Sequence, residues 1–399
     1  MTPKTSSPKT RRPRTRRWRI VHADCLTALP KLDADSIDVV ITDPPYGIGM
    51  SGMAWDGRTI ADAACSDLAV RERLGTRGRT RGGSAFGSPS AYAGAYDFTP
   101  RGMQAFQTFS VRWTRECLHV LKPGGHLAAF ASPRTAHRLA CGLEEAGFEL
   151  RDALMWLHGQ GFPKSLNPTG RAAGWGTALK PAYEPILLAR KPLQGTLKQN
   201  LARYGTGALH IDACRSHDPD LPCPDQGRTH ARSASPQGRW PANVSLSHAH
   251  RCTERRCAQD CPIGRLADRA RFFYCPKTSR RERDAGCEQL SRRTIQTFQI
   301  GAHNERKAKA RPVANIHPTV KPIELMRWLV RLLTPPDGLV LDPFTGSGST
   351  GIAALLEDAR FVGIEREDEY VPIARARIKH WARQGGHLAD GLEIPRGSR

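Results

Sequence analysis

Short apolar runs of strand length alternate with stretches of helical periodicity in the first and last parts of the chain. Seven such runs predict strands, near residues 20–23, 37–42, 126–131, 149–157, 184–190, 339–342 and 361–365. Helical patterns lie between or after them, at 25–32, 106–121, 134–146, 323–333 and 369–384. Such alternation is typical of a parallel sheet with helices on both faces. We therefore predict an α/β fold with a Rossmann-like, doubly wound, seven-stranded sheet, which segments from both ends of the chain complete.

Three stretches depart from this alternation. The runs at 149–157 and 184–192 are separated by a Gly/Pro-rich loop, and they could pair as an antiparallel ribbon. Residues 47–100 are rich in Gly, Ser and Arg and have no periodicity, which predicts a mobile loop. Residues 193–312 are rich in Arg, His and Cys with only short apolar runs, which predicts a separate, inserted irregular module.

Composition and charge indicate which parts of the chain fold and what kind of partner it binds. Residues 1–18 are basic and lack acidic side chains, so we expect a flexible arm, and we expect 387–399 to be a flexible tail. Residues 19–192 and 313–386 would form the two halves of one domain. The chain has 60 Lys and Arg against 38 Asp and Glu, a net charge of +22 that favours polyanionic partners such as nucleic acid. It lacks a membrane-length apolar stretch and a signal peptide, so we expect a cytoplasmic protein.

A glycine-rich segment, DPFTGSGSTG at 342–351, lies between a predicted strand and a predicted helix. Glycines let the backbone turn tightly and approach a ligand, and the start of a helix offers free N–H donors. Glu365 ends the next strand, where a carboxylate can accept hydrogen bonds from ribose hydroxyls. The pattern predicts a nucleotide-type site that includes Asp342, Pro343, Phe344, Gly346, Gly348 and Glu365.

The same segment satisfies the GxGxxG pattern, so a nicotinamide dehydrogenase is an alternative. Only 34 residues follow Glu365, however, and a dinucleotide-binding fold of the usual order needs several more strands after that point. A mononucleoside is therefore favoured, and an adenosine that carries a methionine sulfonium fits.

A second motif, Asp43-Pro44-Pro45-Tyr46, directly follows the strand-like run IDVVIT. The carboxyl end of a parallel strand faces the crevice where ligands bind in such sheets. The prolines restrict the local backbone, which holds a carboxylate, a carbonyl and an aromatic ring in one turn. If Asp43 and the Pro44 carbonyl each accept one N–H, an exocyclic amino group is held with its lone pair aimed at a methyl donor. The motif thus predicts direct, in-line methylation of an aromatic amine.

These two motifs, in VVITDPPYG and NIHPTVKPIELMRWLVRLLTPPDGLVLDPFTGSGST, resemble those of the amino-methyltransferases of bacterial and phage DNA. Their order, with DPPY early and the glycine-rich segment late, resembles the permuted β-class of that family. The resemblance covers roughly 18–192 and 313–385. It implies the permuted methyltransferase fold, S-adenosyl-L-methionine as the cofactor and double-stranded DNA as the substrate. It also implies that the target base is flipped out of the duplex.

The resemblance further implies roles for individual residues. Asp24 would lie near the adenine of the cofactor, and Thr319 or Lys321 would meet its methionine carboxylate. Tyr46 would stack on the flipped base, and 193–312 would be the target-recognition module. Enzymes of this kind take part in restriction-modification, so a restriction endonuclease is one expected partner, while the oligomeric state stays open.

The target base has two candidates. DPPY goes with adenine N6 more often than with cytosine N4, so we favour N6, although the same groups suit both amines. RNA or a glutamine side chain would use a similar turn, but those substrates usually go with Asn in place of Asp43. A basic DNA-binding protein without activity is disfavoured because both motifs are intact.

Cysteines and histidines gather in the inserted segment. The ligand types in this cluster suit zinc, but its spacing matches no standard finger, so free thiols are favoured and no metal is assigned. The cluster comprises His248, His250, Cys252, Cys257, Cys261 and Cys275, with Cys287 further on. Cys223 could suggest the nucleophile of ring-carbon methylation, but its polar, turn-like surroundings argue against that role.

Overall fold

The computed structural model describes residues 17–48, 54–56, 60, 99–158, 170–176, 178–179, 181–215, 240–246, 273–275, 277–294 and 312–384. Most of the predicted basic arm, most of the predicted loop 47–100 and the predicted tail 387–399 lie outside these residues. None of the helices in these ranges is long and apolar enough to cross a membrane.

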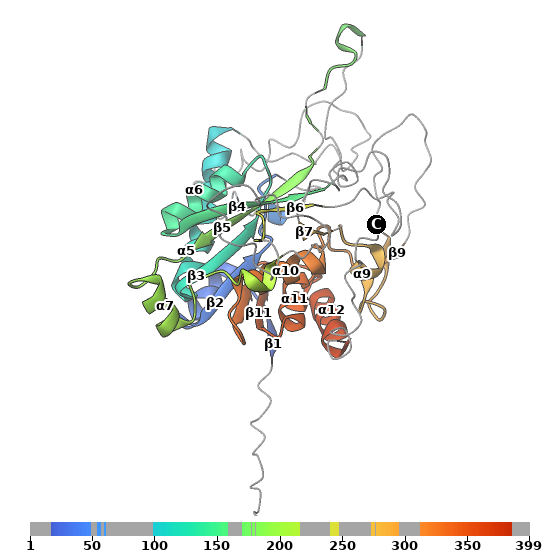
Figure 1. The fold of residues 1–399 in the computed structure, drawn as a ribbon. Helices are drawn as coiled ribbons and strands as arrows, with labels where there is room; N and C mark the ends of the chain where they lie inside the picture. Colours follow the sequence, from blue (N-terminus) through green and yellow to red (C-terminus); the bar gives the residue numbers. More distant parts are fainter. Residues whose placement is uncertain are drawn as a thin grey trace, which may run out of the picture.

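One large mixed sheet dominates the fold (Figure 1). Its spatial order is β1 (Trp18–His22), β11 (Arg360–Glu365), β10 (Leu339–Asp342), β2 (Ile37–Thr42), β3 (Leu121–Phe130), β5 (Tyr183–Arg190), β4 (Glu149–Leu157), β6 (Val244–Leu246) and β7 (Phe273–Tyr274). All neighbours pair in parallel except β5, which runs antiparallel to both β3 and β4. The segments predicted as a ribbon therefore do pair antiparallel, and both ends of the chain contribute strands as expected.

Within the described residues the sheet has nine strands rather than the predicted seven. All seven predicted strands are present, and β6 and β7 extend the sheet beyond β4. These two strands have three and two residues, too short to be distinguished from loop by an apolar pattern. The first strand also begins at Trp18, inside the stretch predicted as a basic arm.

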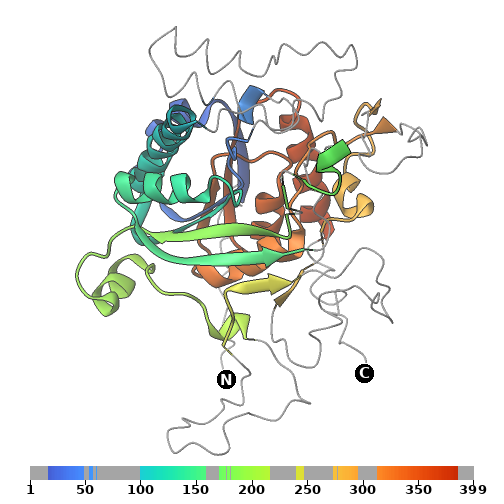
Figure 2. The same cartoon turned by 90° about the horizontal axis from the view of Figure 1, so that it is seen from above.

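Helices cover both faces of the sheet. Figure 2, viewed from above, shows the teal α5 and α6 on one side and the orange and red α10 to α12 on the other. The helices and turns are α1 (Cys25–Ala28), η1 (Leu29–Lys31), η3 (Ala54–Asp56), α5 (Pro100–Val120), α6 (Ala136–Ala146), η4 (Gly170–Ala172), α7 (Leu197–Tyr204), η5 (Asp212–Cys214), α9 (Arg280–Asp284), α10 (Ile323–Leu333), α11 (Ser349–Leu356) and α12 (Val371–Gln384). Strands β8 (Arg293–Thr294) and β9 (Pro312–Val313) form a separate antiparallel pair.

Burial on both faces explains why the central strands have continuous apolar runs. Every residue of β2 is buried, and successive side chains point to opposite faces. Val39 and Ile41 pack in the cluster that includes Leu329 of α10. Val40 packs in the other cluster, with Trp113 of α5. The core is thus two apolar layers with the sheet between them.

Parts of the segment predicted as a separate module lie on this sheet. Besides β6 and β7, helix α7 contacts β3. The buried Asn200 side chain of α7 donates a hydrogen bond to the carbonyl of Pro123 at 2.9 Å. His210 donates its backbone N–H to Leu332 of α10 at 2.8 Å. Residues 216–239 and 247–272 lie outside the described residues, so the boundaries 193–312 stay a prediction.

Strand direction decides which side chains meet. The parallel strands β1, β11, β10, β2 and β3 all end at one edge of the sheet. Because β5 is reversed, its first residues lie at that same edge, and β4, antiparallel to β5, ends there. Polar side chains just after β2 or at the start of β5 therefore converge.

Candidate active site

A cleft opens at this edge of the sheet and brings the two motifs together. Most of the residues predicted for the site line it: Asp24, Asp43, Pro44, Pro45, Tyr46, Thr319, Pro343, Phe344, Gly346 and Glu365. The other lining residues are Ala23, Cys25, Leu26, Trp55, Asp56, Phe109, His317, Ile364, Arg366, Glu367 and Tyr370. Segments about 300 residues apart in sequence thus face one cleft because β2 and β10 are neighbours in the sheet.

The DPPY turn is anchored on both sides. Thr135, just before α6, donates its hydroxyl to the carbonyl of Tyr46 at 2.6 Å. The next residue, Gly47, has a φ of +67° and donates its N–H to the buried Asp56 carboxylate at 2.7 Å. A β-carbon at Gly47 would lie 2.6 Å from the Phe106 ring, so the turn needs glycine there. These contacts preorganise the turn.

Asp43 lies in a polar contact network. Its Oδ2 is 2.5 Å from the ammonium of Lys321, and its Oδ1 accepts the Tyr46 hydroxyl at 2.7 Å. Burial raises the pKa of Asp43, and the Lys321 charge offsets part of that rise. Burial lowers the pKa of Lys321, but the carboxylates of Asp43 and Glu184 outweigh it and leave this pKa raised. Lys321 therefore stays an ammonium.

The glycine-rich segment is shaped by the buried Asp342. Its carboxylate accepts hydrogen bonds from the hydroxyls of Thr42 (2.7 Å) and Thr350 (2.6 Å) and from the N–H of Phe344 (3.0 Å). Gly348 is the N-cap of α11 with a φ of +81°, and a β-carbon there would lie 3.2 Å from the backbone of α12. Asp342 and Gly348 do not line the cleft, so both act on the shape of the segment.

Asp342 gives a prediction about stability and pH. Burial raises its pKa to about 6, although its three hydrogen bonds oppose the rise. Between its unfolded pKa, near 4, and 6 the folded protein binds more protons than the unfolded chain, so stability falls as the pH rises. We expect the wild type to lose about 1–3 kcal/mol relative to Asp342→Asn between pH 4.5 and 7.5. Urea unfolding of both proteins across that range measures it, and parallel curves would contradict it.

Two carboxylates and several apolar side chains form the other half of the cleft. Glu365 accepts the N–H of Gly346 at 2.7 Å, and Asp24 caps α1 by accepting the N–H of Leu26 at 2.8 Å. Leu26, Phe109, Phe344 and Ile364 supply apolar lining. Acceptors beside an apolar slot suit the hydroxyls and the flat base of a nucleoside.

The sequence did not predict several of the residues that line the cleft. Trp55 and Phe109 belong to segments read as loop and as ordinary helix, so neither pattern indicated a ligand. Tyr370 contacts the His317 ring edge to face, with centroids 4.6 Å apart. His317 lies in the HPTVKP segment, so the motif could have identified it as a lining residue. Glu184 lies at the start of a predicted strand, and nothing in that pattern indicated a role in the site.

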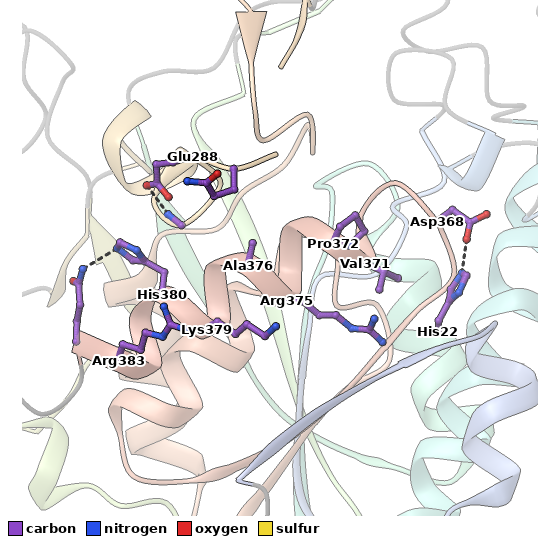
Figure 3. Close-up of a pocket in the computed structure, with 13 residues that line it drawn as sticks. His22, Glu288, Asp368, Val371, Pro372, Arg375, Ala376, Lys379, His380 and Arg383 are labelled. Atoms are coloured by element: carbon purple, nitrogen blue, oxygen red, sulfur yellow. Dashed lines mark hydrogen bonds and ion pairs between the residues drawn. The ribbon is translucent and has the colours of Figure 1, made fainter. Parts of the chain in front are cut away.

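A second groove follows α12 (Figure 3). Arg375, Lys379 and Arg383 lie along it one helical turn apart, and His22 meets Asp368 at 3.2 Å near one end. The groove holds basic side chains but no residue of either motif. We therefore take the cleft that holds both motifs as the active site.

The predicted cysteine and histidine cluster falls mostly outside the described residues. Cys275 and Cys287 are described, and both are buried thiols whose pKa burial raises. In the part of the chain that the structure covers, no three His, Cys, Asp or Glu side chains are placed to hold a metal.

Comparison with known proteins gives a family and several relatives. A family model described as DNA methylase, N6_N4_Mtase, matches residues 37–376. The type II methyltransferase M.HindIII of Haemophilus influenzae is 24% identical over 375 residues, which is 90% of this chain and 94% of that protein. M2.MboI of Moraxella bovis is 46% identical over 61 residues, 15% of this chain and 22% of that protein. Among solved structures, PvuII DNA methyltransferase (cytosine-N4-specific) covers 92% of both chains at 14% identity with a TM-score of 0.44.

Proposed function

The chain belongs to the DNA methylase family N6_N4_Mtase, and from this premise we propose that it methylates adenine N6 in double-stranded DNA with S-adenosyl-L-methionine as donor. The observation that carries the proposal is that Asp43 of the DPPY turn and Glu365 beside the glycine-rich segment line one cleft. One side of that cleft offers acceptors for an amino group, and the other suits a nucleoside. Transfer between two bound groups needs both in one place.

The DPPY turn would prepare the amino group for attack. The lone pair of an exocyclic amine is delocalised into the ring, so the amine is a poor nucleophile. Asp43 and the Pro44 carbonyl would each accept one N–H, which directs the lone pair at the methyl carbon. The N–C bond would form as the C–S bond breaks and releases a neutral thioether, and the surplus proton would then pass from the nitrogen to water.

The cofactor half of the cleft would bind the donor. When bound, S-adenosyl-L-methionine supplies a methyl group on a sulfonium, a good leaving group that needs no covalent enzyme intermediate. Glu365 would accept ribose hydroxyls, Asp24 would lie by the adenine and Thr319 by the methionine carboxylate. Lys321, the other candidate for that carboxylate, contacts Asp43 instead.

Two observations support DNA as the substrate: the match to the DNA methylase family and the net charge of +22. A base within a duplex cannot reach such a cleft, so the target would be flipped out and stacked on Tyr46. We assign recognition of the DNA sequence to residues 193–312, and a restriction endonuclease as a functional partner belongs to the same proposal. Cytosine N4 is the alternative target because the same acceptors suit its amine.

Nucleoside mass spectrometry tests the target base. The purified protein is incubated with unmethylated bacterial DNA and S-adenosyl-L-methionine carrying a labelled methyl group, and the DNA is digested to nucleosides. We expect the label in N6-methyladenine. Label in N4-methylcytosine would keep the mechanism and change the base, whereas DNA without label would overturn the proposal.

A further inference from the structure

A cluster of buried ionisable side chains lies behind the DPPY turn, and the proposed mechanism does not use it. Glu184 is at the start of β5, His158 follows β4 and Lys277 follows β7. The reversed direction of β5 brings Glu184 to the edge where Asp43 and Lys321 meet. His158 and Lys277 lie at the same edge because β4 and β7 end there. His158 and Lys321 are strongly buried, with side-chain exposures of 3% and 7%, and Glu184 is partly buried at 21%.

Both oxygens of Glu184 face polar partners. Its Oε2 accepts the Tyr46 hydroxyl at 3.2 Å and lies 3.5 Å from the Lys321 ammonium. Its Oε1 lies 3.5 Å from His158 Nε2 and 3.8 Å from the Lys277 ammonium. Glu184 therefore contacts the same two side chains, Tyr46 and Lys321, that occupy the oxygens of Asp43.

The Tyr46 hydroxyl has one hydrogen but two carboxylates within reach. Lys321 likewise lies between two carboxylates, and its charge is held above the rings of Tyr46 and Phe130, at 5.4 and 4.9 Å from their centroids. Buried charges are tolerated only when they are paired. Two carboxylates and two ammonium groups balance here, so the cluster carries no surplus positive charge toward a cationic donor.

We propose that Glu184 is a positioning residue for methyl transfer, which holds Lys321 and Tyr46 in place so that the carboxylate of Asp43 stays aimed into the cleft. The inference rests on the proposed function and deepens it. A protonated Asp43 would carry an O–H donor and would be a weaker acceptor for an N–H of the base than the carboxylate. The ammonium of Lys321 favours the ionised form of Asp43, and Glu184 fixes where that ammonium lies.

Removing the charge of Glu184 and removing the charge of Lys321 should shift the pKa of Asp43 in opposite directions. The charged and titratable groups that face Asp43 are Lys321, Tyr46, Glu184 and, from β10, Asp342, with His158 and Lys277 beyond Glu184. Burial raises the pKa of Asp43, Lys321 lowers it and Glu184 raises it. Removing the Glu184 charge should therefore lower this pKa, and removing the Lys321 charge should raise it.

Single-turnover methyl transfer to DNA, measured against pH, tests the proposal. In Glu184→Gln the acid limb of the profile should move to lower pH by about one unit, and in Lys321→Met to higher pH by at least about one unit. The plateau rate of Glu184→Gln should fall roughly 10- to 100-fold because the acceptor is no longer held in position. A residue that only stabilises the fold would lower the rate without moving the limb.

The outcomes separate this inference from the proposed function. A wild type without activity on DNA contradicts the proposed function alone. The pKa of Asp43 is then followed by carboxyl-carbon NMR of ¹³C-aspartate-labelled protein, with Asp43→Asn assigning the signal, and the same opposite shifts are expected. If Glu184→Gln does not fold, Glu184→Asp takes its place, because the shorter side chain withdraws the carboxylate from Tyr46 and Lys321 and should lower the plateau rate. The inference is overturned if neither the acid limb of the rate profile nor the NMR titration of Asp43 moves in the folded variants. It is also overturned if either moves opposite to the expected direction.

Discussion

Asp43→Ala should lower the rate of methyl transfer by roughly 10²–10³-fold while S-adenosyl-L-methionine binding stays close to that of the wild type. Asp43 lines the part of the cleft next to Tyr46, whereas Asp24 and Glu365, proposed for the cofactor, keep their backbone contacts in the variant. The amino group would lose its charged acceptor and its lone pair would no longer be directed. Single-turnover kinetics with labelled donor and calorimetric titration of the cofactor measure the two quantities separately.

Asp38→Ala is a matched control because Asp38 lies on β2, the strand that Asp43 directly follows. Asp38 is the second residue of β2 and pairs with Lys122 at 2.6 Å, much as Asp43 follows β2 and pairs with Lys321 at 2.5 Å. Asp38 also accepts the N–H of Leu339 at 2.7 Å, at the end of the strand away from the cleft. Both substitutions should destabilise the fold, but only Asp43→Ala should lower the rate of transfer by roughly 10²–10³-fold. Equal losses of rate in the two variants would mean that Asp43 acts through stability.

The pattern of apolar runs predicted the central sheet well because burial on both faces leaves a strong signal. β2 is the clearest case, since all six of its residues are buried. The same reasoning missed β6 and β7, which pair through backbone hydrogen bonds that any residue can make. Such short strands leave little apolar pattern, so their pairing depends on β4, which β6 joins, and on β6, which β7 joins.

The two motifs could be placed in one cleft from sequence because each follows a strand of the same parallel sheet. The sequence could not show which buried side chains contact the DPPY turn from the side away from the cleft. Glu184 reaches Tyr46 and Lys321 only because β5 is reversed, and a glutamate at the start of a strand otherwise reads as solvent-exposed. The predicted antiparallel ribbon did not fix which of its two strands runs parallel to β3, so it did not place the start of β5 at this edge of the sheet.

Arg377 shows another limit of sequence patterns. An arginine in an amphipathic helix reads as exposed, yet Arg377 of α12 is fully buried. It donates to the carbonyl of Ser347 at 2.6 Å, and burial lowers its pKa to about 10. A loop that turns sharply leaves carbonyls without backbone partners, and a long buried donor satisfies one of them. The pattern of α12 could not show this, because the need arises from the glycine-rich segment.

Gly346→Ala, in the glycine-rich segment, should have the second large effect, a loss of affinity for the cofactor. Gly346 has a φ of +52°, which costs alanine about 1–2 kcal/mol. A β-carbon there would also lie 2.5 Å from Nε2 of His317, whose ring is neutral because burial lowers its pKa to about 3. His317 packs against Tyr370, and both line the cleft. Relieving the clash must move the wall of the proposed cofactor site, so affinity for S-adenosyl-L-methionine should fall at least about tenfold.

Gly205→Ala separates the backbone cost from the clash. Gly205 ends α7 with a φ of +73°, and nothing lies within 4 Å of a β-carbon built there. It should therefore lose about 1–2 kcal/mol of stability and keep cofactor binding, whereas Gly346→Ala should lose more of both. Urea unfolding and calorimetric titration of the two variants compare them directly. Cofactor binding that is unchanged in Gly346→Ala would show that the glycine-rich segment does not form the cofactor site, because the substitution cannot be accommodated there without moving His317.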